Sequence, residues 1–123
     1  MEKYSKEGKM NRIAAEKITR GAICVLNSEN KIALASASST GLLLVANWDV
    51  EAGDTLSADI VGASAGTHVC TLTAATYAVG DKLALAAGGK LAKVTSSETV
   101  VGYFLGEAGT TTGDTAQEVA LIA

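Results

Sequence analysis

Residues 53–61 read GDTLSADIV, a glycine-aspartate turn followed by a short strand with alternating side chains. Glycine permits the backbone conformation of a tight turn, and the aspartate can accept hydrogen bonds from backbone amides just beyond it. Within the strand, Leu56, Ala58 and Ile60 share one face, and polar side chains occupy the positions between them. This alternation predicts a half-buried β-strand that begins directly after the turn.

The same step recurs along the chain, as Gly80-Asp81, as Gly113-Asp114 and in a degenerate form as Arg20-Gly21. Each copy precedes a short apolar run. The expected strands cover residues 22–26, 31–35, 42–46, 55–61, 67–73, 82–86, 90–94, 100–105 and 117–122. Closely spaced short strands joined by tight turns predict an all-β fold, a small single-domain β-barrel or sandwich of about nine strands.

The length and composition bound the size of the core. A chain of 123 residues forms one domain, long enough for a single core but not for two. Aromatic residues make up 4% of the chain and proline is absent, so leucine, isoleucine and valine must supply most of the burial. A small β-domain of this kind gains stability when it buries further surface in an oligomer.

The net charge of −3 is unevenly distributed. Residues 1–20 hold six basic and three acidic groups, whereas the remainder carries a net charge of −6. We therefore divide the chain into an extended or partly helical N-terminal arm, residues 1–17, and a β-barrel, residues 18–123. A mildly basic arm on an acidic body suits docking to another protein or to a second copy. The acidic body would repel phosphates, which argues against a nucleic-acid partner.

Two cysteines, Cys24 and Cys70, are too few for a disulfide framework and fit a reducing cytoplasm. The N-terminal sequence has no apolar signal core, and no apolar run is long enough to cross a bilayer. We expect a soluble protein, made in the cytoplasm, that has no membrane partner.

His68 and Cys70 lie two positions apart on an expected strand and so share a face, which Cys24 could approach. A zinc site would need a fourth ligand or a water, and no CxxC or HxxxH spacing supports one. A catalytic role for His68 lacks an activated nucleophile, because thiols packed within strands are normally inert. We favour a partly buried histidine beside two apolar cysteines, and predict no catalytic, cofactor-binding or metal-binding residues.

Trp48 follows the apolar strand 42–46 and has two possible roles. It could cap the open end of the barrel, or it could be an exposed anchor for a partner, since tryptophan is enriched at binding hot spots. The sequence leaves both open.

Four stretches resemble the small β-barrel capsid decoration (cement) proteins of tailed bacteriophages. They are residues 18–23 (ITRGAI), 50–56 (VEAGDTL), 79–90 (VGDKLALAAGGK) and 99–108 (TVVGYFLGEA). Each stretch is simple in composition, and the resemblance lies in their succession.

The resemblance implies a non-enzymatic virion protein on the capsid exterior, synthesised in the cytoplasm of the host bacterium. Such proteins bind the major capsid protein, often as homotrimers, and staple neighbouring capsomers. The family has no motif that fixes contact residues. From charge and position, we expect contacts with the capsid or another subunit at Lys3, Tyr4, Lys6, Lys9, Arg12, Ile13 and Trp48, with the arm as a tether.

Two alternatives belong to other functional classes. Residues 50–54 resemble the strand-turn pattern of biotinyl and lipoyl carrier domains, which present a modified lysine on a hairpin tip. Lys82 follows Asp81 but precedes a leucine-containing strand, so the usual attachment site is missing. A small ligand-binding barrel, or an enzyme built around His68, is the remaining alternative.

Overall fold

The computed structural model describes residues 8–62, 67–110 and 115–122, and the fold within these ranges is all-β, as predicted. The strands are β1 (Lys9–Ile13), β2 (Ile23–Leu26), β3 (Ile32–Leu34), β4 (Leu44–Ala46), β5 (Thr55–Ile60), β6 (His68–Leu72), β7 (Thr76–Tyr77), β8 (Lys82–Ala86), β9 (Lys90–Lys93), β10 (Gly102–Phe104), β11 (Gly109–Thr110) and β12 (Thr115–Leu121). A short 3-10 segment, η1 (Ala87–Gly89), separates β8 from β9. No helix in the described ranges has the length and apolar character needed to span a membrane.

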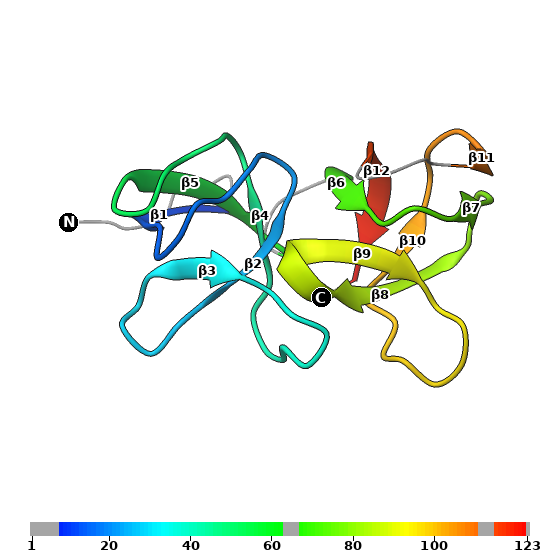
Figure 1. Cartoon of the computed structure of the whole chain (residues 1–123), viewed down its shortest axis with the longest axis horizontal. Coiled ribbons are helices and arrows are strands. Elements are labelled where there is room, and N and C mark those ends of the chain that lie inside the picture. The colour runs from blue at the N-terminus through cyan, green and yellow to red at the C-terminus, as the bar shows by residue number, and fades with distance from the viewer. Residues whose placement is uncertain (1–7, 63–66, 111–114, 123) are drawn as a thin grey trace.

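The strands form two bodies that lie side by side along the long axis (Figure 1). The first is a five-stranded sheet in the order β1-β5-β4-β2-β3, with antiparallel pairing throughout. The chain after β1 returns to the far edge, where the Ala15 amide donates to the Ile32 carbonyl at 2.8 Å. This contact brings the two edges of the sheet together and curls it around its own apolar side.

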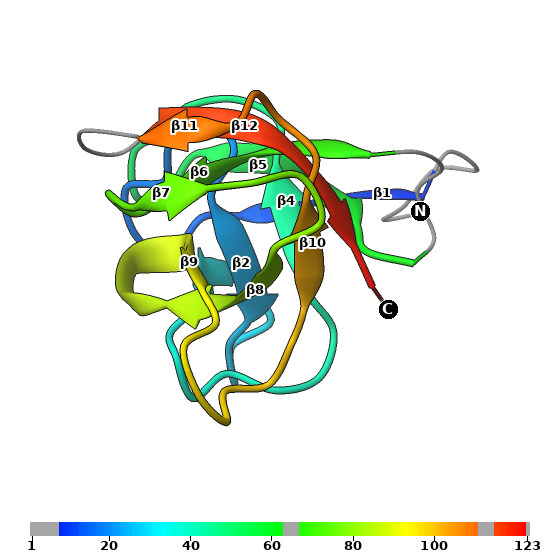
Figure 2. The same cartoon turned by 90° about the vertical axis from the view of Figure 1, so that its right-hand side faces the viewer.

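The second body is a closed barrel in the order β10-β12-β6-β9-β8, and β8 pairs with β10 to complete the ring (Figure 2). Its pairs are antiparallel except β6 with β9, which run parallel where Leu72 meets Leu91. A separate two-stranded sheet, β7 with β11, lies at the outer end.

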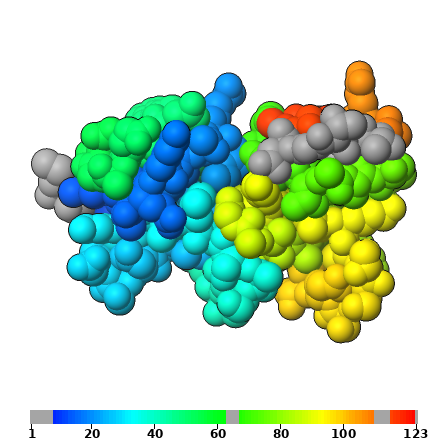
Figure 3. Space-filling view, in the orientation of Figure 1, coloured from blue at the N-terminus to red at the C-terminus, as the bar shows by residue number. Residues whose placement is uncertain are grey.

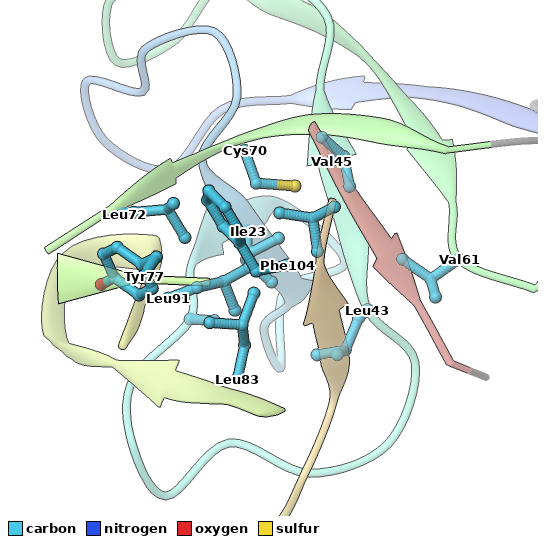
Figure 4. Close-up of a cluster of buried hydrophobic side chains, with 12 residues drawn as sticks. Ile23, Leu43, Val45, Val61, Cys70, Leu72, Tyr77, Leu83, Leu91 and Phe104 are labelled. Atoms are coloured by element: carbon cyan, nitrogen blue, oxygen red, sulfur yellow. The ribbon is translucent and has the colours of Figure 1, made fainter. Parts of the chain in front are cut away.

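Two apolar clusters fill these bodies, which corrects the expectation of a single core. The amino-terminal core consists of Met10, Ala14, Ile18, Ala22, Cys24, Ile32, Leu44, Ala46, Val50, Leu56 and Ala58. The carboxy-terminal core consists of Ile23, Ala35, Leu43, Val45, Val61, Cys70, Leu72, Tyr77, Leu83, Leu91, Phe104 and Val119 (Figure 4).

Strands β2 and β4 contribute side chains to both cores, which allows a short chain to form two cores. Ile23 faces the carboxy-terminal core and the next residue, Cys24, faces the amino-terminal one. On β4, Val45 and its neighbour Leu44 divide in the same way. Neighbouring side chains on these strands therefore point into different cores. Because both faces of each strand are buried, its sequence is a continuous apolar run and does not alternate with polar residues.

The glycine-aspartate turns form as predicted, but the aspartate bonds in the opposite direction. Gly53 and Gly80 have φ of +93° and +90°, in the region that favours glycine. The Asp81 carboxylate accepts from the Ala78 amide at 2.8 Å, three residues before it and not beyond it. Asp54 accepts from the Glu51 amide in the same way, at 3.4 Å. The Gly113-Asp114 step lies outside the described residues.

Residues 8–17, the described part of the expected arm, are integrated into the amino-terminal body. Strand β1 pairs with β5 over five residues, and Met10 and Ala14 are buried in the amino-terminal core. Strand β1 was not predicted, because its apolar residues Met10 and Ile13 are separated by two polar residues and do not alternate as the residues of a half-buried strand do. Strands β7 and β11, each two residues long, were missed as well.

Two backbone contacts join the bodies, and each involves a glycine. The Thr71 amide of β6 donates to the Gly21 carbonyl at 3.1 Å, and the Gly89 amide donates to the Ala35 carbonyl at 2.9 Å. A Cβ atom on Gly89 would lie only 2.6 Å from the Ile23 carbonyl oxygen. The close approach of η1 to β2 therefore requires glycine at position 89.

Replacing Gly89 by alanine should destabilise the fold more than the same change at Gly53. Both glycines have positive φ, so each substitution costs about 1 kcal/mol of backbone strain. Position 53 has nothing within 4 Å of the added Cβ, whereas position 89 meets the β2 backbone, which adds about 1–3 kcal/mol. Urea unfolding of Gly89→Ala and Gly53→Ala measures the difference, and equal losses would contradict the tight joint.

Candidate functional site

A groove of about 610 Å³ opens between two loops on the lower side of the molecule in Figure 3. One wall is residues 37–41, the other is residues 97–100, and the floor includes Leu43, Leu85 and Ile122. The walls are rich in serine and threonine, and the floor is apolar. No local pattern in the sequence predicts this groove, because its two walls come from loops about sixty positions apart.

Glu98 is the only charged side chain among the described residues that line the groove. Its carboxylate accepts from the Thr95 amide and hydroxyl at 3.2 and 2.9 Å, and from the Ser96 amide and hydroxyl at 2.9 and 3.2 Å. Backbone and hydroxyl hydrogen bonds to its own loop lower the pKa of Glu98 to about 2. A carboxylate has about four acceptor positions, so Glu98 is committed to holding this wall in place.

A polar cluster lies where β5 meets β6, at the junction of the two bodies. Asp59 forms an ion pair with Lys9 at 2.6 Å, accepts from the Asn47 amide group at 3.1 Å and lies 3.6 Å from the His68 Nδ1. Burial alone would raise the pKa of Asp59, but hydrogen bonds from Lys9 and Asn47 and the charges of Lys9 and His68 hold that pKa below its usual value. The cluster connects β1, β5, β6 and the residue that directly follows β4.

The structure separates the residues that the sequence offered as a metal or catalytic set. Cys24 belongs to the amino-terminal core and Cys70 to the carboxy-terminal core. Burial raises the pKa of each thiol to about 12, so both remain protonated at neutral pH. His68 is buried beside Asp59, and no metal-binding group of histidine, cysteine or carboxylate side chains occurs in the described part of the chain.

Four of the expected contact residues fall in the described ranges, and Lys3, Tyr4 and Lys6 lie outside them. Lys9, Arg12 and Ile13 all lie on β1, and the side chain of Ile13 is 45% exposed. Ile13 pairs with Thr55 at the start of β5, and Trp48 lies in the connection that leads into that strand.

Trp48 is 49% exposed, and its loop is held on both sides. The side chain of Asn47 donates to Ser57 and Asp59, and the carboxylate of Asp49 accepts from the Arg20 amide at 2.7 Å. Two further hydrogen bonds join Val50 and Ile18, at 2.9 and 3.1 Å. A large, half-exposed ring on a fixed loop loses little conformational freedom when a partner binds it.

Lys82, considered as a carrier attachment site, is the first residue of β8 and pairs with Tyr103 of β10. A carrier lysine needs a protruding hairpin tip, and this position lies inside a sheet ladder.

The Asp59→Asn variant tests the polar cluster through its pH dependence. Because the folded-state pKa lies below the unfolded value of 3.8, ionised Asp59 stabilises the fold above that pH and loses this contribution as pH falls through the folded-state pKa. Above pH 5 the variant should be about 1–2 kcal/mol less stable than the wild type, and the gap should narrow below pH 3.8. Denaturant unfolding across pH measures both, and parallel curves at every pH would contradict the assignment.

The hydrogen bonds of Glu98 in the groove wall can be tested by titration. As pH falls, the amide resonances of Thr95 and Ser96 should shift with a midpoint near pH 2, because protonated Glu98 accepts less strongly. NMR spectroscopy follows both amides, and the Glu98→Gln variant is the control in which this midpoint disappears. A midpoint near 4.5, the ordinary value for glutamate, would show that the four hydrogen bonds are not maintained in solution.

The fold is similar to that of a known protein, although the sequence is not. No protein-family model matches the sequence, and no curated protein matches it significantly. Among solved structures, the chain is similar to the N base of the head fiber protein gp8.5 of bacteriophage phi29, with a TM-score of 0.67 and 16% sequence identity. The similarity covers 92% of this chain and 92% of that one, so the two proteins share a fold across both bodies.

Proposed function

We propose that this protein is a structural component of a tailed-phage virion that binds the outer surface of the capsid. The observation that carries the proposal is the similarity in fold to the phi29 head fiber base over 92% of both chains. The succession of sequence stretches that resembles capsid decoration proteins supports the same assignment independently. The protein would be made in the host cytoplasm and act on the virion exterior.

The role is one of binding and not of catalysis. The neighbour in fold is a structural phage protein, and the titratable groups described above are engaged in structural contacts. Asp59 anchors a cluster at the junction of the bodies, Glu98 holds a loop, and both thiols are buried. These contacts supply rigidity, which suits a protein that makes many weak contacts repeated by symmetry.

We infer that the protein staples neighbouring capsomers as a homotrimer, with the surface around Ile13 and Trp48 against the major capsid protein. Both side chains are close to half exposed and border the connection into β5. The tether is confined to residues 1–7. Deleting residues 1–17 would remove β1 and its five pairs with β5, so loss of binding by that truncation would not isolate the tether.

Sedimentation with expanded, undecorated capsids of the phage whose genome encodes this chain tests the proposal. The wild type should co-sediment and saturate at a fixed ratio to capsid sites. Trp48→Ala should weaken binding about tenfold or more, because a preorganised aromatic anchor is a typical hot spot.

The matched control is Val69→Ala, which shortens a side chain that is 50% exposed on β6, a strand of the carboxy-terminal barrel. A variant lacking residues 1–7 keeps Gly8, whose carbonyl accepts from the Ile60 amide, and tests the tether with the sheet intact. Wild-type protein that remains in the supernatant with its own capsid would refute the virion role.

A further inference from the structure

The two bodies repeat one strand topology. In the amino-terminal body the pairing runs β1-β5-β4-β2-β3, and a parallel bridge between Ala14 and Ile32 joins the last strand to the first. In the carboxy-terminal body the pairing runs β6-β12-β10-β8-β9 and closes in the same parallel sense, where Leu72 meets Leu91. Apart from the short β7 and β11, the strands of the two bodies therefore occupy the same places in chain order.

The pairing registers of the two bodies agree as well. Three consecutive hairpin pairs correspond, namely Cys24 with Leu34, Val25 with Ala33 and Leu26 with Ile32 in the first body, and Leu83 with Lys93, Ala84 with Ala92 and Leu85 with Leu91 in the second. The Gly21 amide donates to the Ala46 carbonyl at 3.0 Å, as the Gly80 amide donates to the Phe104 carbonyl at 2.7 Å. The recurring glycine step of the sequence thus precedes corresponding strands, β2 and β5 in one body and β8 and β12 in the other.

Corresponding positions also fill the two interiors. The amino-terminal core receives Ala14, Ile18, Cys24, Ile32, Ala46 and Ala58, and the carboxy-terminal core receives their counterparts Leu72, Tyr77, Leu83, Leu91, Phe104 and Val119, in the same order. Because topology, register and core positions all recur, the chain is a tandem repeat of one barrel unit.

The two units meet through unlike surfaces. The first unit contributes the face of β2 and β4, where Ile23 and Val45 are buried. The second unit contributes one end, formed by β6 at the buried Cys70 and by η1 at the buried Gly89 (Figure 4). Because a face meets an end, the contact is heterologous. The face of the second unit and the end of the first unit lie outside it.

The face of the second unit carries a charge where the joint carries an apolar residue. Lys82 has the position of Ile23, because Lys82 pairs with Tyr103 of β10 as Ile23 pairs with Val45 of β4. Ile23 is fully buried, whereas Lys82 is exposed.

The end of the first unit differs from the joint in a similar way. Arg12 has the position of Cys70, since each lies two residues before the residue that forms the parallel bridge. Asn30 has the position of Gly89, since each lies two residues before the bridge partner on the next strand. The φ angles of Asn30 and Gly89 are +61° and +74°, and Asn30 is the only non-glycine residue with positive φ in the described ranges.

We propose that Arg12, Asn30 and Lys82 block a second joint, so that the row ends at two barrel units and copies do not add to it. A further copy docked like the second unit would bring its Arg12 to Lys82, because their counterparts Cys70 and Ile23 lie in one core. Two cations in a buried contact repel one another and lose hydration.

Asn30 adds a steric obstacle. A Cβ at the corresponding position 89 would lie 2.6 Å from the Ile23 carbonyl oxygen, so an asparagine side chain does not fit this approach. A heterologous contact that repeats without closing produces an open filament, and these three residues prevent that outcome. The inference goes beyond the proposed function and does not rest on the virion role.

Two variants of the full chain open one surface each. The face variant is Lys82→Ile, at an exposed position where an isoleucine suits a strand. The end variant combines Arg12→Ala with Asn30→Gly, and glycine adopts the positive φ of position 30 freely. Thermal unfolding first establishes that each is folded. Arg12→Met, which keeps the aliphatic length, replaces Arg12→Ala if the half-buried position requires it.

Sedimentation velocity of the mixed variants provides the decisive measurement. Each variant alone should keep the wild-type size, because its other surface is still blocked. The mixture should form a one-to-one complex of the two species. Exchange of the Ile13 amide in the labelled end variant should slow on mixing, because its counterpart, the Thr71 amide, donates to the Gly21 carbonyl across the joint.

The matched control is Lys17→Ile, the same change at an exposed lysine between β1 and β2, and its mixture with the end variant should not associate. A face and end mixture that shows only the sizes of its components would overturn the proposal. Equal association with the Lys17→Ile control would do the same, because the contact would then be unspecific. Association of either variant by itself would show that the opposite surface is not blocked, which also contradicts the proposal.

Discussion

The fold depends on two strands that are buried on both faces. Strands β2 and β4 of the five-stranded sheet send alternate side chains into two separate cores, so the carboxy-terminal core depends on strands of the amino-terminal body. This arrangement requires the backbones of the two bodies to approach closely. Gly89 permits that approach because it has no Cβ atom. A Cβ at this position would lie 2.6 Å from the carbonyl oxygen of Ile23 on β2. Because side chains of β2 and β4 take part in both cores, the two bodies form one structural unit with two interiors.

The polar contacts at the junction complement this sharing. Asp59 connects Lys9 of β1 with His68 of β6, so one carboxylate joins the first described strand to the start of the barrel. Such a partly buried, multiply bonded group specifies a geometry more than it adds net stability, because its desolvation offsets much of its attraction. The rigid relation between the bodies fits the proposed function, in which the protein would present binding surfaces at fixed positions.

The sequence predicted the fold class, the glycine turns and most strands, because these follow from local rules. The hairpin from β2 to β3 forms around Asn27, whose side-chain oxygen accepts from the Glu29 and Lys31 amides. The second core was missed because an apolar run such as residues 42–46 looks the same whether one or two interiors receive it. The groove, the Asp59 cluster and the fold of β1 depend on contacts between distant segments, which no local pattern encodes. Cys24 and Cys70 were placed correctly on strands, but their separation into two cores followed from the topology.

Strand β12 pairs with both β6 and β10, so the carboxy-terminal barrel closes around the last strand of the described chain. During synthesis, β6 emerges long before its antiparallel partner and presents an unpaired strand edge until residues 115–121 leave the ribosome. Contacts between such distant segments also slow folding, because the connecting loop must be ordered before the pairing stabilises it. A growing chain with an exposed edge is prone to pair with its neighbours. If the protein is made in many copies for a virion, as proposed, rapid completion of β12 would keep those copies from pairing with one another before they assemble.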